Sequence, residues 1–200
     1  MTNVTVLLLG GSSGVGKTTI AAHLAPQLGM TWGSVDDVRL VLERMTTPDH
    51  QPALHFFFQH LTQLAPEDLA QRYQAVAAVV SYALEIIVAN HVATAAPLLL
   101  EGDTITPSMA AQRQFADLAV DQQVRAVFLV ESDEAIIRHN MLERGRGIEQ
   151  ASPQDIARMI RFSWLHGQWL QHEARRYGLP VIAARPRETV IDRILAAIAQ

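Results

Sequence analysis

Residues 4 to 19 read VTVLLLGGSSGVGKTT, and this stretch decides the fold. Its first six residues are apolar apart from one threonine, which is typical of a strand buried on both faces of a parallel sheet. Gly11 to Thr18 then fit the pattern G-x-x-x-x-G-K-[ST] at every fixed position. Because the motif follows one strand and opens one helix, it predicts a phosphate-binding P-loop at a helix N-terminus.

The chemistry of this loop predicts the nucleotide. We expect the Lys17 amine to contact the β- and γ-phosphates and the Thr18 hydroxyl to ligate Mg²⁺, so ATP and Mg²⁺ are the expected cofactors. One further candidate, Arg185, follows the last predicted strand, where an adenine ring commonly rests. The predicted nucleotide-binding residues are Gly11, Ser12, Ser13, Gly14, Val15, Gly16, Lys17, Thr18, Thr19 and Arg185.

The rest of the chain predicts the architecture around the loop. Apolar runs at 30–35, 97–100, 124–130 and 179–184 predict four more strands separated by helical segments. Five strands alternating with helices predict an α/β fold of three layers, the P-loop NTPase fold with a five-stranded parallel sheet. We take residues 1–200 as a single domain.

Two segments interrupt the strand–helix alternation. Residues 47–96 are helical in period and lack a strand pattern, which predicts a helical, substrate-binding insertion. Residues 144–152 join two helices and carry Gly145 and Gly147, which predicts a hinged lid.

Composition excludes several classes of function. A formal net charge of -4 gives no general attraction to nucleic acid, and the absence of cysteine excludes disulfides and thiolate chemistry. The most apolar stretch, residues 75–97, contains Glu85, Asn90 and His91, so we expect no membrane span. These features predict a soluble, cytoplasmic protein with a small-molecule substrate; the oligomeric state stays open.

Acidic residues follow two of the predicted strands, at the edge of the sheet where ligands bind. Asp36 is expected to accept a proton from a substrate hydroxyl, and Arg39, one turn later, to hold an anionic substrate. Asp37 is a weaker candidate. Glu101 and Asp103 are candidate substrate-binding residues and magnesium ligands; they project differently, so only one of them is expected to face the metal.

Arginines in the predicted lid supply positive charge. Arg144 and Arg146 are expected to stabilise the charge that develops on the transferred phosphoryl group, so the predicted catalytic residues are Lys17, Asp36, Arg144 and Arg146. The eight histidines show no metal-ligand spacing and are expected to be structural. Arg72 and Tyr73 are expected at the surface.

These motifs together resemble the P-loop small-molecule kinases of the 2-phosphoglycerate kinase type. Zeta-toxin-like and chloramphenicol-phosphotransferase-like kinases are more distantly similar. The resemblance rests on residues 10–19, 34–39 and 101–103 and on the arginine-rich stretch from Arg138. It implies a nucleoside-monophosphate-kinase-like core with ATP as donor and Mg²⁺ as metal. Residues 103–107, DTITP, depart from the histidine-containing run of similar proteins, so the acceptor stays open.

The resulting hypothesis is an ATP-dependent kinase acting on a hydroxyl of a small, anionic molecule. A P-loop alone does not define the reaction, so a nucleotide-dependent regulatory ATPase is an alternative. A kinase of a nucleotide-sugar or an antibiotic is another. The missing N-K-x-D motif argues against a Ras-like GTPase.

Overall fold

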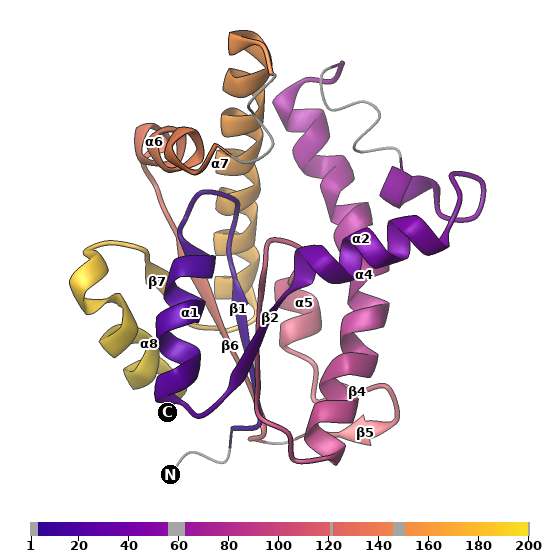
Figure 1. Cartoon of the computed structure of the whole chain (residues 1–200), viewed down its shortest axis with the longest axis vertical. Coiled ribbons are helices and arrows are strands. Elements are labelled where there is room, and N and C mark those ends of the chain that lie inside the picture. The colour runs from indigo at the N-terminus through magenta and orange to yellow at the C-terminus, as the bar shows by residue number, and fades with distance from the viewer. Residues whose placement is uncertain (1–3, 56–62, 121, 146–150, 200) are drawn as a thin grey trace.

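A five-stranded parallel sheet forms the centre of the protein. The structure is a computed structural model, and it describes residues 4–55, 63–120, 122–145 and 151–199 (Figure 1). The strand order is β2-β3-β1-β6-β7, and every neighbouring pair is parallel, which confirms the predicted fold class. The strands are β1 (Val6–Gly10), β2 (Thr31–Ser34), β3 (Leu98–Gly102), β6 (Val124–Val130) and β7 (Val181–Ala183).

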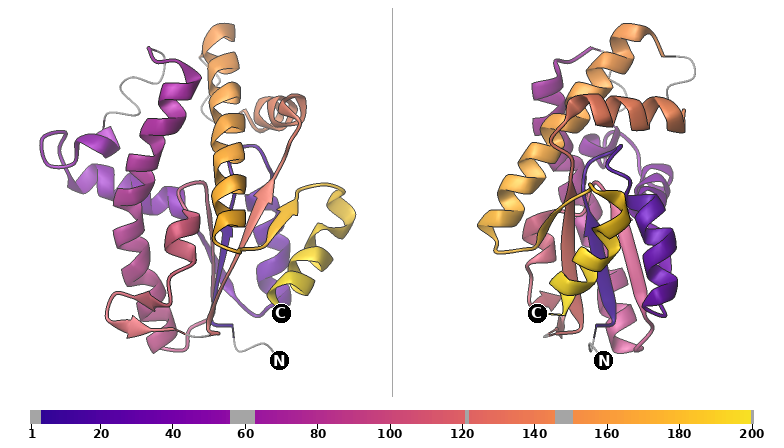
Figure 2. Two further views of the ribbon diagram at one scale, coloured as in Figure 1. Left: turned by 180° about the vertical axis from the view of Figure 1, so that it is seen from behind. Right: turned by 90° about the vertical axis from the view of Figure 1, so that its left-hand side faces the viewer.

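Helices cover both faces of this sheet and make three layers (Figure 2). Side chains alternate along a strand, so Val6 and Leu8 of β1 face one core, whereas Leu7 and Leu9 face the other. The first core includes α4, α5 and α7, and the second includes α1 and α8. The helices are α1 (Lys17–Gln27), α4 (Pro66–Ala93), α5 (Pro107–Ala110), α7 (Pro153–Arg176) and α8 (Val190–Ile198).

The strand register places the candidate site at one edge of the sheet. Gly10 of β1 lies opposite Gly102 of β3, and Ser34 of β2 lies opposite Glu101. The P-loop and the helix α2 (Val35–Met45) therefore start beside the acids that follow β3. Helix α6 (Glu134–Arg144) follows β6 and lies across the same end (Figure 1).

Small elements between β3 and β6 escaped prediction. They are α5 and the two-stranded hairpin of β4 (Gln114–Phe115) and β5 (Leu118–Ala119). The hairpin turn contains Ala116 at a positive φ of 48°, a position that usually carries glycine or asparagine. Its sequence therefore lacks the residues by which such a turn is recognised. A 3₁₀ turn, η1 (Arg187–Thr189), likewise precedes α8.

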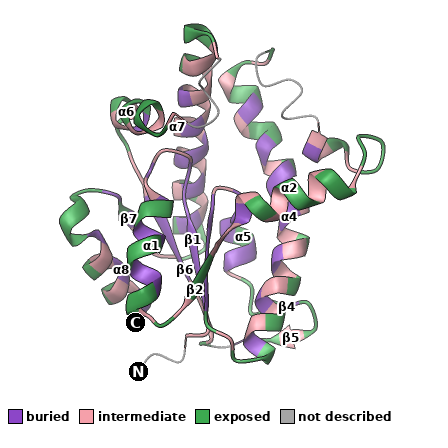
Figure 3. Ribbon diagram, viewed as in Figure 1, coloured by how far each residue is buried: buried purple, intermediate pink, exposed green. Residues whose placement is uncertain are grey.

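Within the predicted insertion, α4 is a core helix of the domain. Residues 52–55 are also helical, whereas 56–62 lie outside the described residues. By length and apolar composition α4 would qualify as a membrane span. Its residues Leu69, Val76, Val80 and Leu84 are nevertheless fully buried in the core that also contains β1 and α7. The purple stripe along α4 in Figure 3 marks this buried face.

Candidate nucleotide and acceptor site

The phosphate loop has a backbone that depends on its glycines. Gly14 has a φ of +82°, and a Cβ atom there would lie 3.0 Å from Met141 Cγ of α6. A Cβ atom on Gly11 would lie 2.6 Å from the carbonyl oxygen of Leu129. The following helix starts at Lys17 without a side-chain cap. Its first-turn N–H groups are thus available to an anion, as the P-loop motif predicts.

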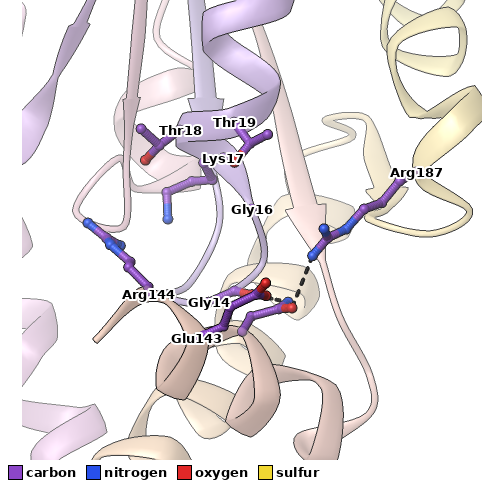
Figure 4. A pocket seen from close by; sticks show the side chains of 9 residues that line it. Gly14, Gly16, Lys17, Thr18, Thr19, Glu143, Arg144 and Arg187 are labelled. Carbon is purple, nitrogen blue, oxygen red and sulfur yellow. Dashed lines mark hydrogen bonds between the residues drawn. The ribbon is translucent and has the colours of Figure 1, made fainter. Parts of the chain in front are cut away.

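A polar cavity of about 440 Å³ lies over the start of α1. Figure 4 shows Lys17, Arg144 and Arg187 around this space, contributed by α1, α6 and η1. The Lys17 side chain is buried, and its Nζ donates to the carbonyl oxygen of Ser12 at 3.0 Å. Three cations from three elements make this cavity suited to a polyphosphate. Its lining residues are Gly14, Gly16, Lys17, Thr18, Thr19, Asn140, Glu143, Arg144 and Arg187.

An apolar cavity of about 260 Å³ lies next to the polar one and shares Gly16, Thr19 and Arg187 with it. Val15, Ile20 and Val190 line it, together with Arg187, which also lines the polar cavity. Such a surface suits the base of a nucleotide. Arg185, the predicted adenine contact, lines neither cavity, and its Nε lies 3.5 Å from Glu131 Oε2.

Helix α6 is connected to the phosphate loop through Asn140. The amide of Asn140 donates to the carbonyl oxygen of Gly14 at 2.7 Å and accepts a hydrogen bond of 3.0 Å from Arg187 Nη2 (Figure 4). Neither Asn140 nor Arg187 was predicted, because each reaches the loop from a distant part of the chain. Arg144 does line the polar cavity, whereas Arg146 lies outside the described residues.

Oxygen donors suited to Mg²⁺ meet at Thr18. Its Oγ1 donates to Glu101 Oε1 at 2.9 Å, and the Glu101 side chain is buried. The described residues contain no cluster of three or more His, Cys, Asp or Glu that could hold a metal. The Thr18 hydroxyl and the Glu101 carboxylate fit Mg²⁺, which prefers oxygen ligands and relies on phosphates and water as much as on protein.

Asp103 has other partners than Thr18. Its Oδ1 accepts a hydrogen bond from Tyr73 at 2.8 Å, and its Oδ2 accepts one from Ser13 at 3.0 Å. Burial alone would raise the pKa of Asp103, but Lys17 and these two hydrogen bonds lower it below its ordinary value. Of the two candidate metal ligands, the geometry thus favours Glu101.

Asp36 lies in the first turn of α2, close enough to Asp103 and Glu101 for their charges to act on its pKa. The Ser34 hydroxyl caps this helix by accepting from the Asp36 N–H. Burial, and then the negative charge of Asp103, raise the pKa of Asp36, while Lys17 opposes them. Asp36 is half-buried, whereas the adjacent Asp37 is exposed.

Arg39 lies on the same helix as Asp36. It forms an ion pair with Glu43 and is close enough to Asp36 to lower the pKa of that carboxyl. The structure therefore brings three predicted residues, Lys17, Asp36 and Arg39, into one electrostatic neighbourhood.

Two further residues of this site, Tyr73 and His166, were missed from the sequence. Tyr73 was expected at the surface, which is wrong, because the side chain is only 4% exposed and its hydroxyl reaches Asp103. Tyr73 belongs to the row of buried residues along α4. The helical spacing of these residues can be seen in the sequence and would have predicted a buried Tyr73. His166 of α7 is also buried, and its Nε2 donates to the Asp103 carbonyl oxygen at 2.8 Å. Burial lowers the pKa of His166 and thus favours the neutral ring.

The fold and the phosphate loop define a P-loop nucleotide-binding protein with acids close to the loop. The chain belongs to the AAA domain family, which it matches over residues 6–162. It is also similar to proteins named 2-phosphoglycerate kinase. The one from Methanothermobacter thermautotrophicus is 25% identical over 205 residues, covering 96% of this chain and 65% of that protein. The one from Thermococcus kodakarensis is 26% identical over 196 residues, with 95% and 64% covered. The chain thus spans slightly less than two thirds of these relatives.

Solved small-molecule kinases share the fold. A sugar kinase from Janibacter sp. superposes with a TM-score of 0.58 at 16% identity, covering 98% of this chain and 95% of that one. Shikimate kinase from Acinetobacter baumannii gives 0.52 at 16% identity, with 99% and 94% covered. At these identities the similarity establishes the architecture.

Proposed function

We propose that this protein is an ATP-dependent kinase that transfers the γ-phosphoryl group of Mg-ATP to a hydroxyl of a small, anionic molecule. The observation that carries the proposal is the position of Asp36. It is a half-buried carboxylate of raised pKa, close enough to the P-loop lysine for the Lys17 charge to act on that pKa. A nucleotide switch has no need of a proton acceptor for a hydroxyl at this place.

In the proposed reaction the acceptor hydroxyl attacks the γ-phosphorus. A new O–P bond forms, the bond between the γ-phosphorus and the bridging oxygen breaks, and the hydroxyl proton passes to the Asp36 carboxylate. The raised pKa of Asp36 makes it a stronger base than an ordinary aspartate. ADP leaves with the electron pair of the broken bond.

The remaining charges act on the phosphates. Lys17 and Arg144 line the cavity where charge develops, and fixed cations stabilise such a transition state. Thr18 and Glu101 would hold Mg²⁺, which, when bound, neutralises phosphate oxygens. Arg146, as a second lid arginine, and residues 144–152, as a closing lid, remain parts of the proposal.

An anionic acceptor is supported by two kinds of evidence. Arg39 on α2 provides a guanidinium within the electrostatic reach of Asp36. The two relatives described above, which match 96% and 95% of this chain, carry the name of a kinase for 2-phosphoglycerate, an anionic hydroxy acid. That compound is therefore the first acceptor to test, and shikimate and gluconate follow from the structural neighbours.

The test is Mg-ATP turnover, measured as ADP release, with 2-phosphoglycerate, other hydroxy acids, nucleosides, nucleotide sugars and antibiotics. We expect one acceptor class to raise turnover well above the basal rate in the wild type, and Lys17→Ala to abolish the increase. Phosphorus NMR of the product identifies the new phosphate ester. Repeating the assay with GTP tests the choice of nucleotide.

Asp36 is tested with its neighbour as the control. Asp36→Asn should lower acceptor-dependent turnover by roughly 10²- to 10⁴-fold, the usual worth of a general base. Asp37→Asn, one residue away and exposed, should leave it unchanged. Full activity of Asp36→Asn would refute the base. Slow hydrolysis that no small molecule stimulates would instead favour a regulatory ATPase.

A further inference from the structure

One carboxylate connects the helical segment to the phosphate loop. Asp103 accepts from Tyr73 of α4 with one oxygen and from Ser13 of the P-loop with the other, at 2.8 and 3.0 Å. Tyr73 and Ser13 are 60 residues apart in the sequence, and neither lies on β3, which delivers Asp103. The position of the Ser13 hydroxyl thus depends on where the Asp103 carboxylate is held.

Helix α7 supports the same three residues from one side. Ser163 donates to the carbonyl oxygen of Ser13 at 2.6 Å, and His166 donates to that of Asp103. The Tyr73 ring packs edge-on against His166, with centroids 5.1 Å apart and planes at 88°. It makes a similar contact with Phe162 at 5.3 Å and 84°. These contacts restrict the ring, so its hydroxyl has little freedom to leave Asp103.

We propose that Tyr73 is a positioning residue whose hydroxyl holds the Asp103 carboxylate against Ser13, and thereby holds the phosphate loop in its nucleotide-binding conformation. The inference rests on the nucleotide site of the proposed function and extends it to a residue outside both cavities beside the loop. Tyr73 acts on the phosphate site indirectly, through Asp103.

The chemistry of the position favours this role over packing alone. A phenylalanine would fill the same apolar space against Phe162 and His166 without a hydroxyl to satisfy. A buried hydroxyl costs free energy unless it is hydrogen-bonded, and Tyr73 meets that cost by donating to a buried carboxylate. Hydrogen bonds to charged groups are the stronger kind, so this bond can fix a side chain on which a second element depends.

The experiment measures Mg-ADP affinity by titration calorimetry in a double-mutant cycle. Tyr73→Phe keeps the ring and removes the hydroxyl, and it should weaken Mg-ADP binding by roughly 10- to 150-fold, the range expected for a hydrogen bond to a charged group. The matched control is Tyr82→Phe on the same helix, where the side chain is 74% exposed and the affinity should not change.

The second arm tests the route through Ser13. If Tyr73 acts through the Asp103–Ser13 contact, then Tyr73→Phe should add little to the loss caused by Ser13→Ala, because both changes break one chain of contacts. A general loosening of the core would make the two losses add. Unchanged affinity of a folded Tyr73→Phe, or full additivity with Ser13→Ala, would overturn the proposal.

Two further measurements keep the result interpretable. If Tyr73→Phe does not fold, Asp103→Asn replaces it, because the amide keeps the shape but has a single oxygen to accept from two donors; unchanged Mg-ADP affinity in this variant would also refute the role. The cycle needs no acceptor, so a chain that binds Mg-ADP but phosphorylates nothing would refute the kinase alone. Failure of the wild type to bind Mg-ADP would refute both.

Discussion

Thr18 Oγ1 and Glu101 Oε1 lie 2.9 Å apart, so the first turn of α1 and the end of β3 meet at a single hydrogen bond. Hydroxyl and carboxylate are ligand types that Mg²⁺ prefers, and Thr18 also lines the polar cavity. The strand register explains the contact, since Leu9 and Gly10 of β1 pair with Glu101 and Gly102 of β3.

Glu101→Gln should raise the Mg²⁺ concentration needed for half-maximal turnover by about 10- to 100-fold, the usual cost of altering a group that supports a metal. The amide oxygen can still accept from Thr18, so the fold should survive while the negative charge is lost. Turnover measured against Mg²⁺ at fixed ATP provides the test. Glu85→Gln, on the outer side of α4 beside Gln112, is the control. Identical Mg²⁺ curves would remove Glu101 from the metal site.

Local patterns were enough to predict the phosphate loop between β1 and α1. The P-loop is contiguous in sequence, and the strand before it and the helix after it are its direct neighbours. The loop can therefore be predicted without knowing any contact between distant parts of the chain. The acids at 36, 101 and 103 were found because they follow strands, and parallel strands bring such positions together. The residues that contact the loop and these acids could not be predicted from local patterns.

Those partners come from elsewhere in the chain. Asn140 reaches Gly14 across 126 positions, and Ser163 reaches Ser13 across 150. Such pairs depend on the strand order and on how α6 and α7 cross the sheet edge, which no short-range periodicity encodes. Tyr73 differs, because its helical stripe pointed inwards and a tyrosine in such a stripe needs a buried partner.

Asp36 should titrate at a pH above its ordinary pKa of 3.8, because burial and the charge of Asp103 both disfavour its ionised form. Carbon NMR of labelled aspartate carboxyls, with Asp36→Asn to assign the signal, measures this directly. Acceptor phosphorylation should fall as the pH falls through that value, because the protonated carboxyl cannot accept a proton. A midpoint at or below 3.8 would contradict the proposed environment.

Because its pKa is raised in the folded protein, ionised Asp36 destabilises the folded state at neutral pH. Since its folded pKa is raised, the stabilising contribution of the protonated form is complete below about pH 3.8 and is lost as the pH rises through the folded pKa. Asp36→Asn should therefore melt at a higher temperature than the wild type at pH 7, and the difference should shrink on acidification. Calorimetric melting at several pH values tests this, with Asp37→Asn as the exposed control. A lower melting temperature for Asp36→Asn at pH 7 would contradict it.

Arg187 rather than Arg185 should contribute to nucleotide affinity. Arg187 lines both the polar and the apolar cavity, whereas Arg185 lines neither and pairs with Glu131. Arg187→Ala should weaken Mg-ADP binding by roughly tenfold, the worth of about 1.4 kcal/mol. Arg185→Ala, two residues away, should have little effect in the same titration. A larger loss of Mg-ADP affinity in Arg185→Ala than in Arg187→Ala would instead support Arg185 as the residue that contacts the nucleotide base.

Gly167 of α7 provides a test of whether the close approach of α7 determines the position of the phosphate loop. A Cβ atom there would lie 2.8 Å from Ser12 Oγ, which is buried beneath the phosphate loop. Alanine is favoured over glycine inside a helix by about 0.8–1 kcal/mol, so Gly167→Ala should not destabilise the helix itself. It should instead displace Ser12 and weaken Mg-ADP binding several-fold.

Removing the obstructing atom should reverse that loss. The next nearest atom to the added Cβ is Ser12 Cβ at 3.4 Å, an ordinary contact, so Ser12→Ala combined with Gly167→Ala should bind Mg-ADP more tightly than Gly167→Ala alone. Calorimetric titration of the wild type, both single variants and the double variant measures the recovery. If Gly167→Ala bound as the wild type does, the close approach of α7 would not determine the position of the loop. If the double variant failed to recover, the loss would have another cause than the Ser12 hydroxyl.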